Sequence, residues 1–200
     1  MCIRDSLTTQ GATRIYKMNS NYATHLVKIN LKNNSYLEFI PEQIIPYNDS
    51  RFYQKTQLNI DESSTVVYSE TIVPGRIAMG EMFDFDVCYL KTECGINEKI
   101  QFRDSSLLIP KKQKIQSLAM FDDKTILTSV YMMTKKPVKK INKMINEMFS
   151  QLQDVSGGSS MMPNESGLSI RILGNSSEDQ KTIIYEILKM IRKEILFEYL

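Results

Sequence analysis

Three charged residues, Glu70, Arg76 and Glu81, surround a Pro-Gly turn inside an otherwise apolar stretch. Charges in such surroundings are costly unless they pair with one another or line a wet cavity. Two carboxylates are also the groups used in general acid and base catalysis, but the sequence places no nucleophile or histidine beside them. The pattern favours an ion-pair network or a polar cavity lining, and we expect that the chain is not an enzyme.

Residues that bind metals strongly are few. The single histidine, His25, has no second histidine or cysteine near it in the sequence, which favours a surface or packing role. Cys88 and Cys94 do not have the spacing of a zinc knuckle, and Cys2 stands alone. We therefore expect no tightly bound cofactor and no resident metal.

A group of lysines marks the start of a predicted helix, at Lys135, Lys136, Lys139, Lys140 and Lys143. The helix dipole disfavours cations at this end, so a solvated helix face is the favoured interpretation. The alternative is a docking patch for an acidic partner, whose binding would weaken with salt.

Composition excludes several classes of protein. Of the 200 residues, 42% are hydrophobic and 24% are charged, which is typical of a globular chain of one or two domains. A net charge of +2 is too small for sequence-independent binding to nucleic acid. The sequence shows neither a long apolar run nor a signal peptide, so we expect a cytoplasmic protein that does not bind membranes.

Short β-like runs separated by Asn, Asp and Ser clusters fill residues 7–134. The expected strands are Leu26–Leu31, Tyr36–Ile40, Phe52–Ile60, Thr65–Val73, Met82–Leu90, Lys99–Arg103, Leu107–Ile109 and Thr125–Met133. The segment from Asn30 to Tyr36 also resembles the segment from Asn59 to Thr65. This repeat predicts stacked strand-turn-strand units, as in a layered or helical, β-solenoid-like domain, although a plain β-sandwich would give similar spacing.

The pattern becomes helical after residue 136. We expect a helix over 137–153, a mobile loop over 154–166, a strand over 168–173 and a final helix over 178–199. Ser177 and Gln180 have the spacing of a capping box for that last helix, whose buried stripe would end at Tyr199. The predicted fold class is mainly β, with two C-terminal α-helices.

Four blocks of the sequence resemble the urease accessory proteins of the UreD/UreH family. They are LTTQGATRIY at 7–16, IPEQIIPY at 40–47 followed by SRF at 50–52, the pattern ExxxxGRxAxGExF at 70–83, and GLSIRILG at 167–174. Their order and spacing agree with the family pattern from residue 7 to the C-terminus. The blocks assign structural motif positions to Gly11, Ser50, Arg51, Phe52, Gly75, Gly80, Arg171 and Gly174.

The chain also departs from the family pattern. Members of the family carry about a further quarter of chain before the first block, and residues 1–6 match nothing in the pattern. We interpret residues 1–6 as non-native and residues 7–200 as a UreD-like domain. Gln10 replaces the usual proline, and the acid of the second block stands at Glu42.

The resemblance implies a function without covalent chemistry. Members bridge apo-urease to UreF, which recruits the GTPase UreG, and they are thought to conduct nickel through an internal tunnel to the urease active site. Matching residues by position assigns the tunnel or its supporting polar network to Thr8, Thr9, Glu42, Glu70, Arg76 and Glu81. Nickel would be cargo in transit, with transient contacts at Glu70 and Glu81.

Two other functions remain open. A β-solenoid enzyme acting on carbohydrate would use paired carboxylates, but the chain has no tryptophan to form a sugar platform. A β-sandwich could also serve as a generic interaction module.

Overall fold

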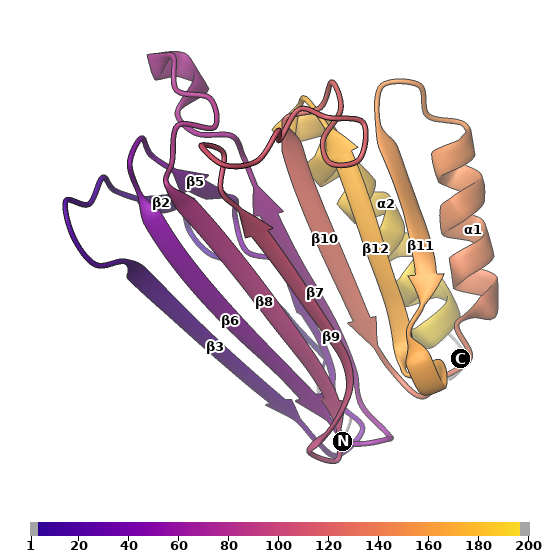
Figure 1. Cartoon of the computed structure of the whole chain (residues 1–200). Coiled ribbons are helices and arrows are strands. Elements are labelled where there is room, and N and C mark those ends of the chain that lie inside the picture. Colours follow the sequence, from indigo (N-terminus) through magenta and orange to yellow (C-terminus); the bar gives the residue numbers. More distant parts are fainter. Residues whose placement is uncertain (1–3, 197–200) are drawn as a thin grey trace.

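Two β-sheets and a pair of helices form three layers in the computed structural model, which describes residues 4–196 (Figure 1). The eight-stranded sheet lies in the middle and is built from β1 (Arg4–Leu7), β2 (Thr13–Ile15), β4 (Tyr36–Phe39), β5 (Ile44–Pro46), β7 (Thr65–Ile72), β10 (Ile126–Met133), β11 (Ser156–Met161) and β12 (Gly167–Gly174). The four-stranded sheet packs on one side of it, with the order β3 (Ala23–Leu31), β6 (Arg51–Ile60), β8 (Val87–Ile96) and β9 (Lys99–Leu108). Helices α1 (Lys139–Ser150) and α2 (Ser177–Leu196) cover the other side.

The internal repeat corresponds to parallel pairing in both sheets. Leu31 on β3 lies opposite Ile60 on β6, and Tyr36 on β4 lies opposite Thr65 on β7. The turns are joined as well, because the backbone N–H of Asn33 donates to the Asp61 carboxylate at 2.8 Å. The predicted stacking of strand-turn-strand units is therefore confirmed for these two segments.

The stacking does not continue as a solenoid. Strand β9 pairs antiparallel with β8, and β10 pairs antiparallel with both β7 and β12. Both sheets are thus mixed, and two sheets packed face to face describe the fold better than the β-solenoid-like arrangement that we expected.

Alternation along the strands decides which side chains enter which layer. On β7, Val67 faces the helices, whereas Val66, Tyr68 and Glu70 face the four-stranded sheet. Helix α1 buries Ile141, Ile145 and Phe149 against the middle sheet, and α2 buries a stripe with the same helical spacing. One apolar cluster lies under the helices and two lie between the sheets.

The C-terminal region departs from the sequence-based expectation in two places. The expected loop over 154–166 is wrong, because Ser156–Met161 forms β11 against β12 and is followed by a short 3-10 helix, Pro163–Glu165. Gly157 is needed for packing, since a Cβ at this position would lie 2.6 Å from Cδ1 of Phe149. The expected capping box is also wrong, because Ser176 caps α2 by accepting the Asp179 N–H at 3.2 Å.

The remaining boundaries differ by smaller amounts. The helix expected over 137–153 spans Lys139–Ser150, and the strand expected over 168–173 is Gly167–Gly174. The helix expected over 178–199 is described as Ser177–Leu196, so Tyr199 lies outside the described residues. The strand expected from Met82 begins only at Val87, after a 3-10 helix at Ile77–Met79 and a loop. Leu107 and Leu108 continue β9 and form no separate strand.

Strands β1, β2, β5 and β11 were not expected from the sequence, and β1 includes residues 4–6, which pair with β4. Among residues 4–196, no helix is long and apolar enough to span a membrane.

Candidate functional site

A layer of polar side chains crosses the space between the two sheets and separates two clusters of apolar side chains there. On one side lies a cluster that includes Phe52 and Phe85, and on the other a cluster that includes Leu58 and Val66. We call the residues between them the polar layer; they are Gln54, Thr56, Tyr68, Glu70, Thr92, Asp104, Ser129, Tyr131 and Arg171.

Glu70 lies at the centre of the polar layer and is 4% exposed. Its Oε2 accepts hydrogen bonds from Gln54 Nε2 at 3.2 Å and the Tyr68 hydroxyl at 3.3 Å, and Thr92 Oγ1 lies 3.5 Å away. The Tyr131 hydroxyl lies 3.2 Å from Oε1. Burial raises the pKa of Glu70, and these donors oppose the shift only in part. Glu70 is thus a buried carboxylate held by neutral groups.

The second carboxylate of the layer, Asp104, has a cationic partner. The Arg171 guanidinium forms an ion pair with Asp104 and donates to Ser129 Oγ and to the Tyr131 hydroxyl, the last at 3.2 Å. The Tyr131 hydroxyl lies 2.7 Å from Asp104 and 3.2 Å from Glu70. It has one proton, so it can donate to only one carboxylate at a time. The layer therefore holds two carboxylates against one guanidinium.

Both ends of the polar layer reach the surface. At the β3 edge, Nδ1 of the exposed His25 lies 2.9 Å from Gln54 Oε1. Because Gln54 Nε2 donates to Glu70, its Oε1 must accept, which places a proton on His25 Nδ1. At the other end, the side chains of Asp104 and Arg171 are 18% and 37% exposed. A chain of hydrogen bonds thus runs between the sheets from His25 to Arg171.

Two of the predicted site residues, Arg76 and Glu81, form an ion pair on a loop away from Glu70. Arg76 Nε donates to Glu81 Oε2 at 2.9 Å, and the guanidinium stacks 4.1 Å from the centroid of the Tyr47 ring. The hydrogen bond from Arg76 lowers the pKa of Glu81. Gly75 supports this turn with a φ of 143°, which glycine tolerates best. The structure therefore does not bring Glu70 and Glu81 together as an acid and base pair.

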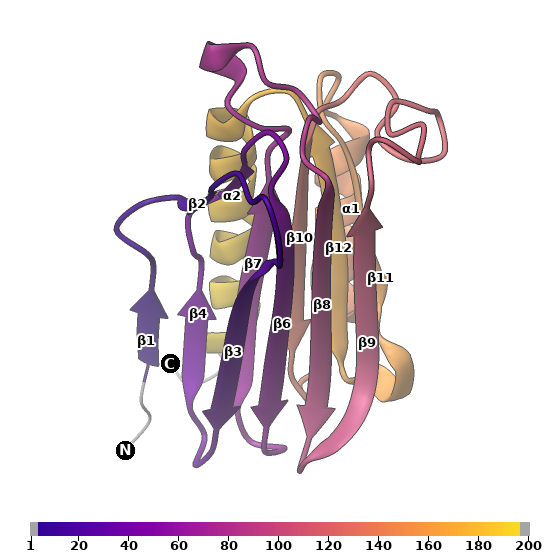
Figure 2. The same cartoon turned by 60° about the vertical axis from the view of Figure 1, so that its left-hand side comes forward.

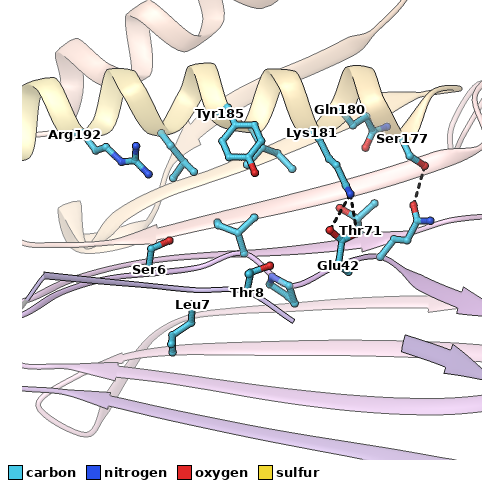
Figure 3. Close-up of a pocket in the computed structure, with 15 residues that line it drawn as sticks. Ser6, Leu7, Thr8, Glu42, Thr71, Ser177, Gln180, Lys181, Tyr185 and Arg192 are labelled. Atoms are coloured by element: carbon cyan, nitrogen blue, oxygen red, sulfur yellow. Dashed lines mark hydrogen bonds and ion pairs between the residues drawn. The ribbon is translucent and has the colours of Figure 1, made fainter. Parts of the chain in front are cut away.

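Thr8 and Glu42 lie at a third place, a groove between α2 and the N-terminal strands (Figure 3), and Thr9 is hydrogen-bonded to Glu42. Thr8 and Glu42 line this cavity of about 150 Å³. The Lys181 ammonium binds the Glu42 carboxylate at 2.8 Å, and Thr9 Oγ1 accepts the Glu42 N–H at 2.9 Å. Thr71, the residue after Glu70, also lines the groove, so β7 separates the groove from the polar layer.

The predicted motif residues have mostly structural contacts. Phe52 is buried, Arg51 binds Asp86 at 2.9 Å, and the Ser50 carbonyl accepts the N–H groups of Asp86 and Val87 at the start of β8. The motif glycines lie at a bend near Thr9, at two turns of the Arg76 loop and at the end of β12; they are Gly11, Gly75, Gly80 and Gly174. Arg171 is the exception, because it belongs to the polar layer.

The sequence analysis missed most of the polar layer. Gln54 and Thr56 occupy the same face of β6 as Phe52 and Leu58, so alternation alone would have marked them as polar residues at inward positions. Tyr68 was visible only as an apolar position. No sequence signal shows that Asp104, on β9 and two strands after β7 in the chain, lies beside the others.

The thiols near the polar layer are buried and free. Burial raises the pKa of Cys94 to about 12 and raises the pKa of Cys88 as well. Both are therefore protonated at neutral pH, whereas the thiolate is the metal ligand. Within residues 4–196, no group of three or more His, Cys, Asp or Glu side chains is placed to hold a metal ion. Cys2 lies outside the described residues.

Comparison with known proteins decides the family. The family model described as "UreD urease accessory protein" matches residues 4–198. The chain belongs to the UreD family. Curated relatives of the same name include proteins of Cenarchaeum symbiosum, 34% identical over 86% of this chain, and of Photorhabdus laumondii, 32% identical over 95% of it. The protein named UreD 2 of Brucella suis is 31% identical over 94%.

UreD relatives are longer than this chain, which covers 61%, 60% and 64% of those three proteins respectively. They are named as accessory proteins and not as urease itself. The UreD family assignment therefore confirms the resemblance and the expectation that the chain is not an enzyme.

Proposed function

We propose that this UreD chain bridges apo-urease to UreF, and through UreF to UreG, and that it conducts nickel to the urease active site in the cytoplasm. The relatives' names support a role in urease maturation. The finer role rests on one observation, the polar layer that runs between the sheets from the exposed His25 to the half-exposed Arg171.

The ligands of the polar layer suit passage better than storage. It offers hydroxyl, amide and carboxylate oxygens along its length, whereas a cage of imidazoles or thiolates would hold Ni²⁺ tightly. A conducted ion must find several weak contacts, each favourable enough to enter and weak enough to leave. Glu70, Thr92 and Tyr131 supply such contacts within one short stretch.

Glu70 provides the driving charge for this passage. A buried carboxylate without an ion-pair partner is costly to ionise, and it gains from any cation that reaches it. Arg171 is committed to Asp104, Ser129 and Tyr131 and does not bind Glu70 directly. A hydrated divalent cation that reaches Glu70 would therefore be stabilised by its carboxylate.

The other predicted residues would support this path from outside it. The Arg76 and Glu81 pair stabilises the loop after the Pro-Gly turn, and Thr9 and Glu42 fasten the N-terminal segment beside Lys181 of α2. Under this proposal Glu81 meets nickel only transiently and at the surface, since its side chain is 14% exposed and outside the layer.

Co-expression with urease subunits, UreF and UreG tests the proposal. We expect this chain to co-purify with UreF and apo-urease, and Glu70→Ala to lower urease activation while the complex still assembles. Thr71→Val is the matched control, because its side chain lies on the groove side of the same strand. Full activation by Glu70→Ala in an intact complex would show that the polar layer does not conduct nickel.

A further inference from the structure

The outer face of the four-stranded sheet is not covered by any helix or strand of the described chain (Figure 2). Strand register places its outward side chains in three rows across β3, β6, β8 and β9. We call these rows the outer face; they are Thr24, Tyr53, Tyr89 and Leu107, then Leu26, Lys55, Lys91 and Ser105, then Lys28, Gln57, Glu93 and Arg103.

Positive charge exceeds negative charge on the outer face. Glu93 accepts contacts from Lys55 at 3.0 Å, Lys91 at 3.1 Å and Arg103 at 3.0 Å. The hydrogen bond from Lys55, with those of its neighbours, lowers the pKa of Glu93 to about 2. Exposed Lys28 stands in the same row. One carboxylate is thus paired with three cations. The N–H groups of these cations that do not bind Glu93 are available to further acceptors.

The same face exposes apolar surface beside these charges. Leu26 is 68% exposed and Leu107 is 44% exposed, and the Tyr53 and Tyr89 rings lie 5.4 Å apart. Contiguous exposed apolar surface rimmed by polar groups marks interaction sites. Aromatic residues and arginine are also the types most enriched at protein interfaces.

The lysines of α1 differ from those of the outer face, although the sequence pointed to them as a docking patch. Lys140 binds Glu194 at 2.9 Å, and Lys143 lies 3.6 Å from Glu147. Each of these two cations has its own carboxylate, so the helix carries no comparable local excess of positive charge.

We propose that the outer face docks an acidic segment of a partner protein. Carboxylates of that segment would take the free donors of Lys55, Lys91 and Arg103, and its apolar side chains would cover Leu26 and the tyrosine pair. A protein is favoured over nucleic acid because four of the twelve residues of the outer face are aliphatic or aromatic and the whole chain has a net charge of only +2. This inference is independent of nickel conduction.

A labelled peptide of alternating glutamate and leucine tests the proposal by fluorescence anisotropy with the full chain. The peptide should bind, and its affinity should fall when salt is raised from about 50 mM to about 500 mM. Replacing both lysines, Lys55→Gln with Lys91→Gln, should weaken binding about tenfold. The matched control, Lys140→Gln with Lys143→Gln on α1, should leave it unchanged.

The Glu93→Gln variant separates the proposal from a loss of structure. It removes the carboxylate that competes with the peptide, so the affinity for the peptide should rise, whereas misfolding would lower that affinity. Three results would overturn the proposal: equal binding of a peptide with glutamine in place of glutamate, an unchanged affinity in the double lysine variant, or weaker binding by a Glu93→Gln protein that keeps the circular-dichroism spectrum of the unmodified chain. Equally strong binding of a single-stranded oligonucleotide would assign the face to nucleic acid and would also overturn it.

Discussion

Arg171 joins the two sheets through the polar layer, and replacing it with methionine isolates that role. The side chain reaches from β12 in the middle sheet to Asp104 on β9 of the four-stranded sheet. Methionine retains much of the apolar stem but leaves Asp104 without its bonded cation and removes the nearby positive charge from Glu70. Arg171→Met should therefore destabilise the fold without removing a large volume.

The exposure of the pair sets the size of the effect. Breaking a fully buried ion pair by removing one partner costs about 3 to 5 kcal/mol, whereas exposed pairs contribute about 0 to 1 kcal/mol. Arg171 is 37% exposed and Asp104 is 18% exposed, so the expected loss lies between these limits, at about 2 kcal/mol. For a chain of 200 residues this is a fall in Tm of about 6 °C.

Urea unfolding of four proteins measures this loss and its origin. They are the unmodified chain, Arg171→Met, Asp104→Asn and the double variant. Asp104→Asn should cost less than Arg171→Met, because the half-exposed guanidinium keeps its bonds to Ser129 and Tyr131. The double variant should lose less free energy of unfolding than the sum of the single losses, by about 1 kcal/mol.

The pH dependence supplies an independent check. Burial already raises the pKa of Glu70, and removing the guanidinium should raise it further. A group with a raised pKa in the folded state binds protons on folding, so stability increases as the pH falls. The deficit of Arg171→Met should therefore shrink from pH 7 toward pH 5. Additive losses, or a deficit that does not change with pH, would refute the account of Arg171 as the cation of the layer.

Three further predictions concern other parts of the fold. Gly157→Ala should lower the free energy of unfolding by about 1 to 3 kcal/mol in a urea titration, since its Cβ would meet the Phe149 ring. Gly158→Ala should lower it far less, because the nearest neighbour of its Cβ would lie 3.5 Å away. Equal losses would contradict this packing. Glu93, with its pKa lowered to about 2 from 4.5, contributes stability that is lost as the pH falls between these values, so Glu93→Gln should flatten the acid limb of a pH series of unfolding curves. The pKa of Glu70 is raised, so its contribution to stability depends on pH in the opposite direction. The unmodified chain should lose stability as the pH rises above 4.5, and the Glu70→Gln variant should lose less over the same range.

Periodicity was sufficient to predict most of the regular elements. The alternation in Arg51–Ile60 and the helical stripe through Ile141, Ile145 and Phe149 are strong local signals, and the structure has a strand and a helix there. The resemblance between two turns predicted their stacking. Strand β11 has no such signal, because its residues SGGSSM form a strand only by pairing with β12 and receiving the Phe149 ring.

Of the polar layer, the sequence predicted mainly its central residue, Glu70. Glu70 stood out as a carboxylate among apolar residues, but so did Glu81, and the sequence does not show that the chain turns away between them. The partners of Glu70 come from strands β6, β8 and β10, so their meeting depends on the register between two sheets. Local patterns do not contain that information.

The nickel content of urease tests the central claim most directly. Apo-urease would be activated with UreF, UreG and either the unmodified chain or its Glu70→Gln variant, and the urease would then be isolated and its nickel measured per active site. We predict that the two complexes assemble equally and that urease activated with Glu70→Gln contains less nickel. Equal nickel content would contradict conduction through the polar layer.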